Sequence, residues 1–117
     1  MAAGRQEWLQ LTVEVPLDPA LPICDPHHHF WNRPGEEYLL GELLYDVHSG
    51  HNIVSTVFIE CREMWRRYGP EELKPIGETE FVEGVVSPSR KHGGTAVAAG
   101  IVGFADLTLG RRGSPRA

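Results

Sequence analysis

The sequence predicts an α/β fold in which a parallel sheet is built from elements in the order β-α-β-α-β. Three runs rich in β-branched or small apolar residues, 21–27, 53–60 and 97–107, predict strands. Two segments with apolar residues at helical spacing, 37–48 and 76–87, lie between them. Successive strands are separated by roughly 30 to 40 residues, as in βαβ units with right-handed crossovers.

The bulk composition fits one ordinary domain and excludes several classes of protein. The chain has 117 residues, enough for a modest core, and no apolar run long enough to span a bilayer. A net charge of −5 argues against nucleic acid as the main partner. Residues 1–11 lack the apolar segment of a signal peptide, so we expect a cytoplasmic protein. Cys24 and Cys61 are expected to be reduced, partly buried thiols rather than a disulfide.

The two ends of the chain differ from its middle. Residues 1–20 predict an extended N-terminal arm, and a short edge strand is possible where apolar and polar residues alternate. The domain itself is expected over residues 21–109. Residues 110–117 are rich in Arg, Gly and Pro, and we expect them to be a disordered tail. The alternating apolar residues of the arm are Leu9, Leu11, Val13 and Val15.

The first predicted strand ends in the run Asp25-Pro26-His27-His28-His29-Phe30-Trp31. Side chains alternate along a strand, so Asp25, His27 and His29 are expected on one face, with His28 and Cys24 on the other. Two imidazoles two residues apart can hold one divalent metal. Asp25 suits either a ligand or a group that orients an imidazole N–H. The alternative is a solvated histidine cluster with adventitious metal affinity.

This run resembles the first-strand motif Asp-x-His-x-His, with trailing aromatic residues, of the amidohydrolase-related family. That family is a branch of the metal-dependent hydrolase superfamily of TIM barrels. Residues 56–60 and 100–107 look like its second and third strands. The resemblance covers about residues 20–110 and implies a partial (β/α)8 TIM barrel holding only the first β-α-β-α-β units. A complete barrel needs eight strands and about 250 residues.

The resemblance also implies an activity and a site. His27 and His29 would bind a divalent metal, zinc or manganese, in a hydrolase acting on the carbonyl of a lactone, ester or amide. The family contains lactonases and decarboxylases, and some members work without a metal, in which case the histidines would bind substrate directly. The general-base aspartate is expected beyond residue 117, so the isolated chain is expected to be inactive.

Four further residues are candidates for contacts with substrate or metal. Asp25 is one, and Trp31 is either a pocket wall or a core aromatic. Glu60 ends the second predicted strand, on the face where barrel enzymes build their sites, but it could simply pair with Arg62. Arg62 could hold a substrate carboxylate by a bidentate contact, or form a surface ion pair. Asp106 is expected to cap a following helix.

Three classes of function remain open at this point. The first is the metal-dependent hydrolase with a small-molecule carbonyl substrate, without nucleic acid or membrane as a partner. The second is an inactive truncated remnant, because three parallel strands expose an edge and an apolar face. The third is a small metal-binding module that uses the histidines directly. A homo-oligomer is compatible with each.

Overall fold

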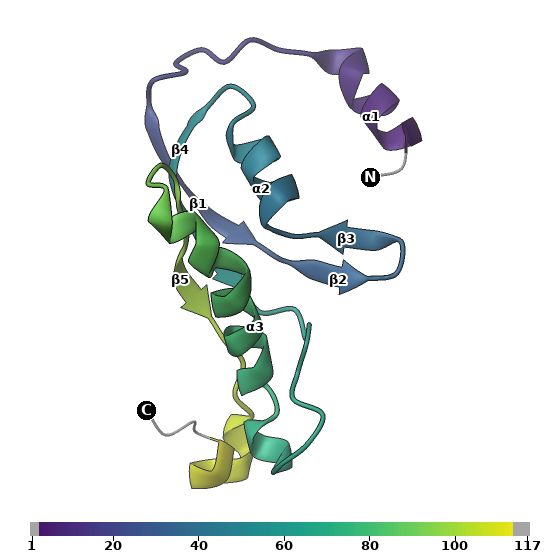
Figure 1. Cartoon of the computed structure of the whole chain (residues 1–117), viewed down its shortest axis with the longest axis vertical. Coiled ribbons are helices and arrows are strands. Elements are labelled where there is room, and N and C mark those ends of the chain that lie inside the picture. Colours follow the sequence, from purple (N-terminus) through teal and green to yellow (C-terminus); the bar gives the residue numbers. More distant parts are fainter. Residues whose placement is uncertain (1–2, 114–117) are drawn as a thin grey trace.

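The computed structural model describes residues 3–113, and a three-stranded parallel sheet forms its centre. The strands are β1 (Pro22–His28), β4 (Asn52–Ile59) and β5 (Ala96–Val102). They lie side by side in the order β1-β4-β5, which is also their order along the chain, and both pairs are parallel (Figure 1). The predicted α/β class and parallel sheet are therefore confirmed.

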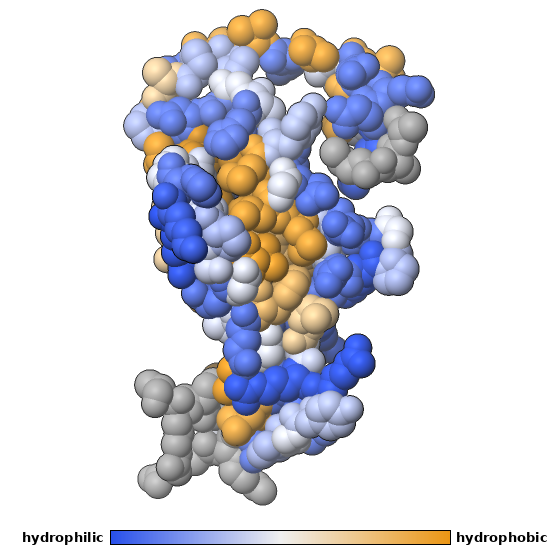
Figure 2. All heavy atoms as spheres, in the orientation of Figure 1, coloured by the Kyte–Doolittle hydropathy of each residue, from blue (hydrophilic) through white to orange (hydrophobic). Residues whose placement is uncertain are grey.

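Two helices connect these strands and cover one face of the sheet. Helix α2 (Leu40–Val47) leads from β1 to β4, and α3 (Ile76–Val86) leads from β4 to β5. Both lie on the same side of the sheet in Figure 1, as right-handed crossovers require. Apolar side chains gather between them (Figure 2). The buried core joins both helices to the strands through Phe30, Leu43, Val47, Phe58, Val82, Val86, Val97 and Ala98.

A β-hairpin lies between β1 and α2 and takes up the start of the predicted helix 37–48. Strands β2 (Trp31–Arg33) and β3 (Glu36–Tyr38) pair in antiparallel fashion. The prediction of a helix over 37–48 is therefore wrong for its first three residues. The cause is the Pro34–Gly35 turn. Gly35 adopts a positive φ of 77°, and the chain reverses its direction there. The two glutamates that follow Gly35 then pair with β2 as part of β3.

The N-terminal arm contains a helix and no strand within its described residues. Helix α1 covers Ala3–Leu9, a 3-10 turn follows at Gln10–Thr12, and the chain then runs without helix or strand, through a turn at 18–21, to β1. The possible edge strand is therefore not formed, and Val13 and Val15 are 79% and 87% exposed. Prolines at 16 and 19 explain this in part, because they remove backbone donors that a sheet edge would need.

The third strand is shorter than predicted and is followed by helical turns. It ends at Val102, and 3-10 turns cover Leu107–Gly113 with a break at Gly110, so they reach into the first part of the predicted tail. The rest of that tail, residues 114–117, lies outside the described residues. Asp106 accepts hydrogen bonds from the backbone N–H (3.0 Å) and hydroxyl (2.5 Å) of Thr108, which confirms its capping role.

The molecule is elongated, with principal extents of 49 × 31 × 28 Å. Its accessible surface is 8579 Å², whereas a compact monomer of this mass exposes about 6300 Å². Part of the excess comes from apolar side chains of the arm and of the sheet edge, such as Leu17 and Val102. Among residues 3–113, no helix has the length and apolar character needed to cross a bilayer.

Candidate metal site

The histidine run lies at the carboxyl end of β1, next to an irregularity in the strand pairing. Asp25 pairs with Thr56 and His28 with Phe58, so three residues of β1 match two of β4. This bulge interrupts the strict alternation that the sequence analysis assumes between Asp25 and His29. The contrast between neighbours nevertheless holds within the run, because His27 is exposed and His28 is buried.

His27 and His29 bring two ring nitrogens together. The Nε2 atoms of the two imidazoles are 3.3 Å apart, and the ring planes are nearly perpendicular at 87°. His29 is oriented by its other nitrogen, which lies 2.8 Å from the carbonyl oxygen of Ile59 at the end of β4. A carbonyl only accepts hydrogen bonds, so Nδ1 of His29 is the donor in this contact, and Nε2 of the neutral ring then has a free lone pair.

This separation fits two ligands of one metal ion. Two nitrogens that are each about 2.0–2.1 Å from a tetrahedral zinc ion lie about 3.3 Å apart. The same distance also suits a hydrogen bond from His27 to the bare Nε2 of His29, which would hold the pair together without metal. Residues 3–113 contain no group of three or more His, Cys, Asp or Glu side chains that could hold a metal, so the pair has no third side chain of these types beside it among the described residues.

Asp25 does not complete the cluster. Its carboxylate reaches forward along the chain and accepts a hydrogen bond from the backbone N–H of His27 at 3.1 Å. The hydrogen bonds of the described residues include none between Asp25 and an imidazole. What this contact does is stabilise the bulged backbone that carries His27, at the point where the pairing with β4 is irregular.

His28 has a structural role in the core. Its Nε2 lies 2.9 Å from the hydroxyl of Thr56, which accepts the backbone N–H of Ala98 at 2.9 Å. The Thr56 side chain of β4 is therefore hydrogen-bonded to a side chain of β1 and to the backbone of β5. The imidazole also packs edge-on against Phe30 and Phe58. Burial lowers the pKa of His28 below its usual value, so the neutral form is favoured.

Trp31 forms a wall beside the histidine pair. Its ring centroid is 5.5 Å from that of His29, with the planes tilted by 57°, and the residue is half-buried at the start of β2. The guanidinium of Arg33 lies over the Trp31 ring, 4.6 Å from the ring centroid. Of the two roles expected for Trp31, its placement fits the wall rather than the core.

Glu60 and Arg62 follow β4 but do not pair with each other. The backbone N–H of Glu60 donates to the carbonyl of Val102 at 2.9 Å, which extends the sheet by one residue. Arg62 is exposed, adopts a positive φ of 63°, and holds its guanidinium 5.8 Å from the Trp65 ring centroid. The ion pairs between described residues do not include the expected alternative between Glu60 and Arg62.

Two buried carboxylates near the site were not anticipated from the sequence. Glu78 is 3% exposed and accepts the backbone N–H groups of Cys61 and Glu63 at 3.0 and 2.8 Å. The Glu63 carboxylate in turn pairs with Nε of Arg33 at 2.9 Å. A signal for Glu78 was present, because within the predicted helix 76–87 it is four and eight residues before the apolar residues Val82 and Val86, which puts it on their face.

The two cysteines differ in environment, and both are free thiols. Cys24 is exposed, so the expectation that it is partly buried is wrong; it lies on β1, which has a sheet neighbour on one side only. Cys61 is half-buried, and burial together with the hydrogen bond to Glu78 raises its pKa to about 12. Cys61 is therefore a protonated, unreactive thiol at neutral pH.

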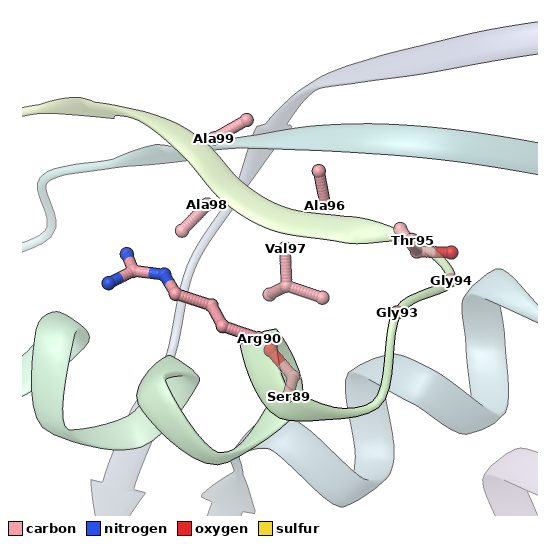
Figure 3. A pocket seen from close by; sticks show the side chains of 9 residues that line it. All are labelled: Ser89, Arg90, Gly93, Gly94, Thr95, Ala96, Val97, Ala98 and Ala99. Carbon is pink, nitrogen blue, oxygen red and sulfur yellow. The ribbon is translucent and has the colours of Figure 1, made fainter.

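A wide recess opens beside the site, and a second cavity lies elsewhere. The recess, of about 1660 Å³, is bounded by the arm, the hairpin and α2, and both His29 and Trp31 line it. The smaller cavity, of about 380 Å³, lies between the end of α3 and the start of β5, where Arg90 reaches toward Ala98 (Figure 3). Both terminal nitrogens of Arg90 already bind Glu83 at 2.9 Å, so its charge is neutralised.

Comparison with known proteins identifies no relative of this chain. No family model matches the sequence, and no curated protein or solved structure matches it either. The interpretation of the site therefore depends on its geometry: two imidazole nitrogens that converge at the carboxyl end of a parallel sheet, walled by an indole and open to a recess.

Proposed function

We propose that this chain takes part in metal-assisted hydrolysis of a lactone, ester or amide carbonyl, with His27 and His29 as ligands of a divalent ion. The observation that carries the proposal is the convergence of their Nε2 atoms at 3.3 Å. The Ile59 carbonyl supports it, because it fixes the His29 tautomer that leaves Nε2 available. A zinc or manganese ion is the candidate cofactor.

The proposed hydrolysis depends on the coordination positions of the metal that His27 and His29 do not occupy. A bound metal supplies a Lewis acid that polarises a carbonyl oxygen and lowers the pKa of a water. His27 and His29 occupy two coordination positions, so the others remain for a further ligand, for water and for the substrate oxygen. Trp31 lines one side of the recess beside His29, and His27 is exposed, so the pair can be reached from solvent.

The fold supports the same proposal through the position of the site. In (β/α)8 barrels, strands follow one another in chain order and catalytic residues lie at their carboxyl ends. Here β1, β4 and β5 lie in chain order, and His29 and Glu60 follow the carboxyl ends of the first two. We therefore propose that these elements are the first three strands of a barrel of the amidohydrolase-related type.

A metal-binding module without catalysis is the second candidate. One observation favours it: the described residues provide no third side chain of the His, Cys, Asp or Glu type within reach of the pair. A two-histidine site binds a metal weakly unless other ligands complete it. An inactive remnant of a hydrolase predicts the same weak binding, with no turnover.

Metal titration of the full chain tests the ligand assignment. We expect about one equivalent of Zn²⁺ or Co²⁺ by calorimetry, and loss of this binding in His27→Ala and His29→Ala. The matched control is His51→Ala, because His51 is an exposed histidine far from the pair in the sequence. If His51→Ala lowers binding as much as His27→Ala does, the metal affinity is adventitious and the proposal fails.

Hydrolysis assays separate the two candidates. Metal-loaded wild-type chain and His27→Ala are compared on p-nitrophenyl acetate and on a simple aryl lactone. A metal-dependent rate that disappears in His27→Ala supports the hydrolase. Stoichiometric metal binding with no rate above that of His27→Ala favours the binding module instead.

A further inference from the structure

We propose that Arg33 and Glu63 are positioning residues for His29, and that they act through Trp31. The inference rests on the proposed function, because the orientation of His29 matters most if its Nε2 is a ligand. It concerns four side chains that come from two segments of the chain, the hairpin after β1 and the connection after β4.

The first link is the contact between the indole and the imidazole. The hydrogen bond from Nδ1 of His29 to Ile59 fixes one point of the ring but still allows the ring to pivot about it. Trp31 at 5.5 Å and Phe58 at 6.5 Å, between ring centroids, flank the imidazole. Phe58 is fully buried in the core, whereas Trp31 is half-buried on a two-stranded hairpin and needs support of its own.

The second link is the support of Trp31 by Arg33. The two residues are two apart on β2, so their side chains lie on the same face of the hairpin. The Arg33 guanidinium lies 4.6 Å from the indole centroid, within the distance of about 6 Å at which cation–π attraction operates. This contact fixes Trp31 only if the guanidinium is itself held in place.

The third link is the ion pair that holds the guanidinium. Nε of Arg33 donates to the carboxylate of Glu63 at 2.9 Å, and the side chains are 47% and 7% exposed. A buried carboxylate is costly unless it is paired, so Glu63 holds Arg33 more firmly than an exposed partner would. The two residues are 30 positions apart, so the pair joins the hairpin to the segment after β4.

The final link is the rigidity of the Glu63 backbone. Its N–H donates to the buried Glu78 carboxylate at 2.8 Å. Immediately after it, Met64 adopts a positive φ of 56°, and its carbonyl packs directly on Gly77 of α3. Glu63 is therefore attached to a helix of the core, and the chain of contacts runs from α3 through Glu63, Arg33 and Trp31 to His29.

The test compares Arg33→Met with Arg66→Met in the full-length chain. Methionine keeps the length of the side chain but removes the charge and the planar group. Arg66 is the control because it also lies in the connection after β4 and forms an exposed ion pair, with Glu80 of α3, whereas the cation on Trp31 is Arg33. The first readout is the set of NOEs between the ring protons of Trp31 and His29 in the metal-free protein. We expect Arg33→Met and Glu63→Gln to lose them and Arg66→Met to keep them.

The second readout is the affinity for Co²⁺. We expect it to fall about tenfold in Arg33→Met and in Trp31→Leu, as for other residues that orient a ligand, and to stay within about twofold in Arg66→Met. If Arg33→Met does not fold, Glu63→Gln and Trp31→Leu carry the same comparison.

A purely structural role gives a different pattern. In that case Arg33→Met and Glu63→Gln lower the melting temperature but leave the Trp31–His29 NOEs and the Co²⁺ affinity as in wild type, which would overturn the inference. Failure of the proposed function is recognised separately: wild type and His27→Ala would then bind Co²⁺ equally weakly. The NOEs still decide whether Arg33 and Glu63 position His29.

Discussion

The segments that follow β1 and β4 meet at the Arg33–Glu63 ion pair, but different interactions determine their conformations. After β1, the chain makes a short antiparallel hairpin whose turn contains Pro34 and Gly35. After β4, the chain forms no strand between 60 and 75, and two non-glycine residues, Arg62 and Met64, adopt positive φ. The first segment is regular and solvent-facing, and the second is irregular and attached to the core.

This difference teaches which interactions specify each segment. A Pro-Gly turn needs only its own residues, because proline presets one φ and glycine accepts a positive one. Positive φ at a non-glycine residue costs about 1–3 kcal/mol and persists only where the surroundings impose it. Here α3 imposes it, through the Glu78 carboxylate and the close packing on Gly77.

The largest expected effect comes from placing a methyl group on Gly77. A Cβ there would lie 2.4 Å from the backbone nitrogen of Arg66 and 2.6 Å from the carbonyl oxygen of Met64. Backbone atoms cannot move aside cheaply, so Gly77→Ala is expected to lower the free energy of unfolding by about 3 kcal/mol. Urea denaturation followed by circular dichroism measures this.

Gly84→Ala is the matched control, because Gly84 is in the same helix and has open space around its Cβ position. We expect it to be neutral or to stabilise by up to about 1 kcal/mol. Equal effects of the two substitutions would show that the segment after β4 is not held by its contact with α3.

The second effect tests the carboxylate that organises the same segment. Glu78→Gln keeps the shape of the side chain but replaces one carboxylate oxygen by an NH2 group, which cannot accept a hydrogen bond, and removes the negative charge that strengthens the hydrogen bonds from the N–H groups of Cys61 and Glu63. We expect a loss of about 2 kcal/mol in unfolding free energy, the scale of a buried charged hydrogen bond. Glu83→Gln removes an exposed carboxylate from the same helix and should change little.

Sequence patterns predicted the framework because the framework depends on local periodicity. The apolar runs at 53–60 and 76–87 have the spacing of a buried strand and of an amphipathic helix, and both elements form close to these limits. Alternation also separated His27 from His28, even though the bulge breaks it between Asp25 and His28. That bulge could not be predicted, because it depends on how β1 meets β4.

The parts of the site that the sequence did not reveal depend on long-range contacts. Glu63 reads as one more charge in a polar connection, and only its approach to Arg33, 30 residues earlier, distinguishes it. The hairpin was missed for a related reason: Glu36 and Glu37 suit the first turn of a helix as well as an exposed strand, and strand pairing decided between them. The spacing of His27 and His29 predicted that they lie together, whereas the contact of His29 with Ile59, 30 residues later, could not be predicted.

A smaller effect is expected in the hairpin, where the turn is locally determined. Gly35 has a φ of 77° and nothing within 4 Å of its Cβ position, so Gly35→Ala introduces backbone strain without a clash. We expect a loss of about 1 kcal/mol, well below that for Gly77→Ala. Gly41→Ala, in α2 and also free of contacts, is the control and should not destabilise. A loss at Gly35 as large as at Gly77 would remove the contrast between the two segments.

The smallest expected effect on stability, but a clear chemical one, concerns Cys61, which lies where the irregular segment begins. Its pKa is raised to about 12 by burial and by Glu78, so at pH 8 almost none of it is thiolate, the form that reacts. Iodoacetamide in native buffer is expected to label the exposed Cys24 much faster, as peptide mass spectrometry would show, and to label both equally in guanidinium. Because the folded-state pKa is raised, the stabilising contribution of the protonated thiol is complete below about pH 8.5 and is lost as the pH rises toward 12. Rapid labelling of native Cys61 would mean that the segment after β4 opens readily, and the rigid anchor inferred for Glu63 would then fail with it.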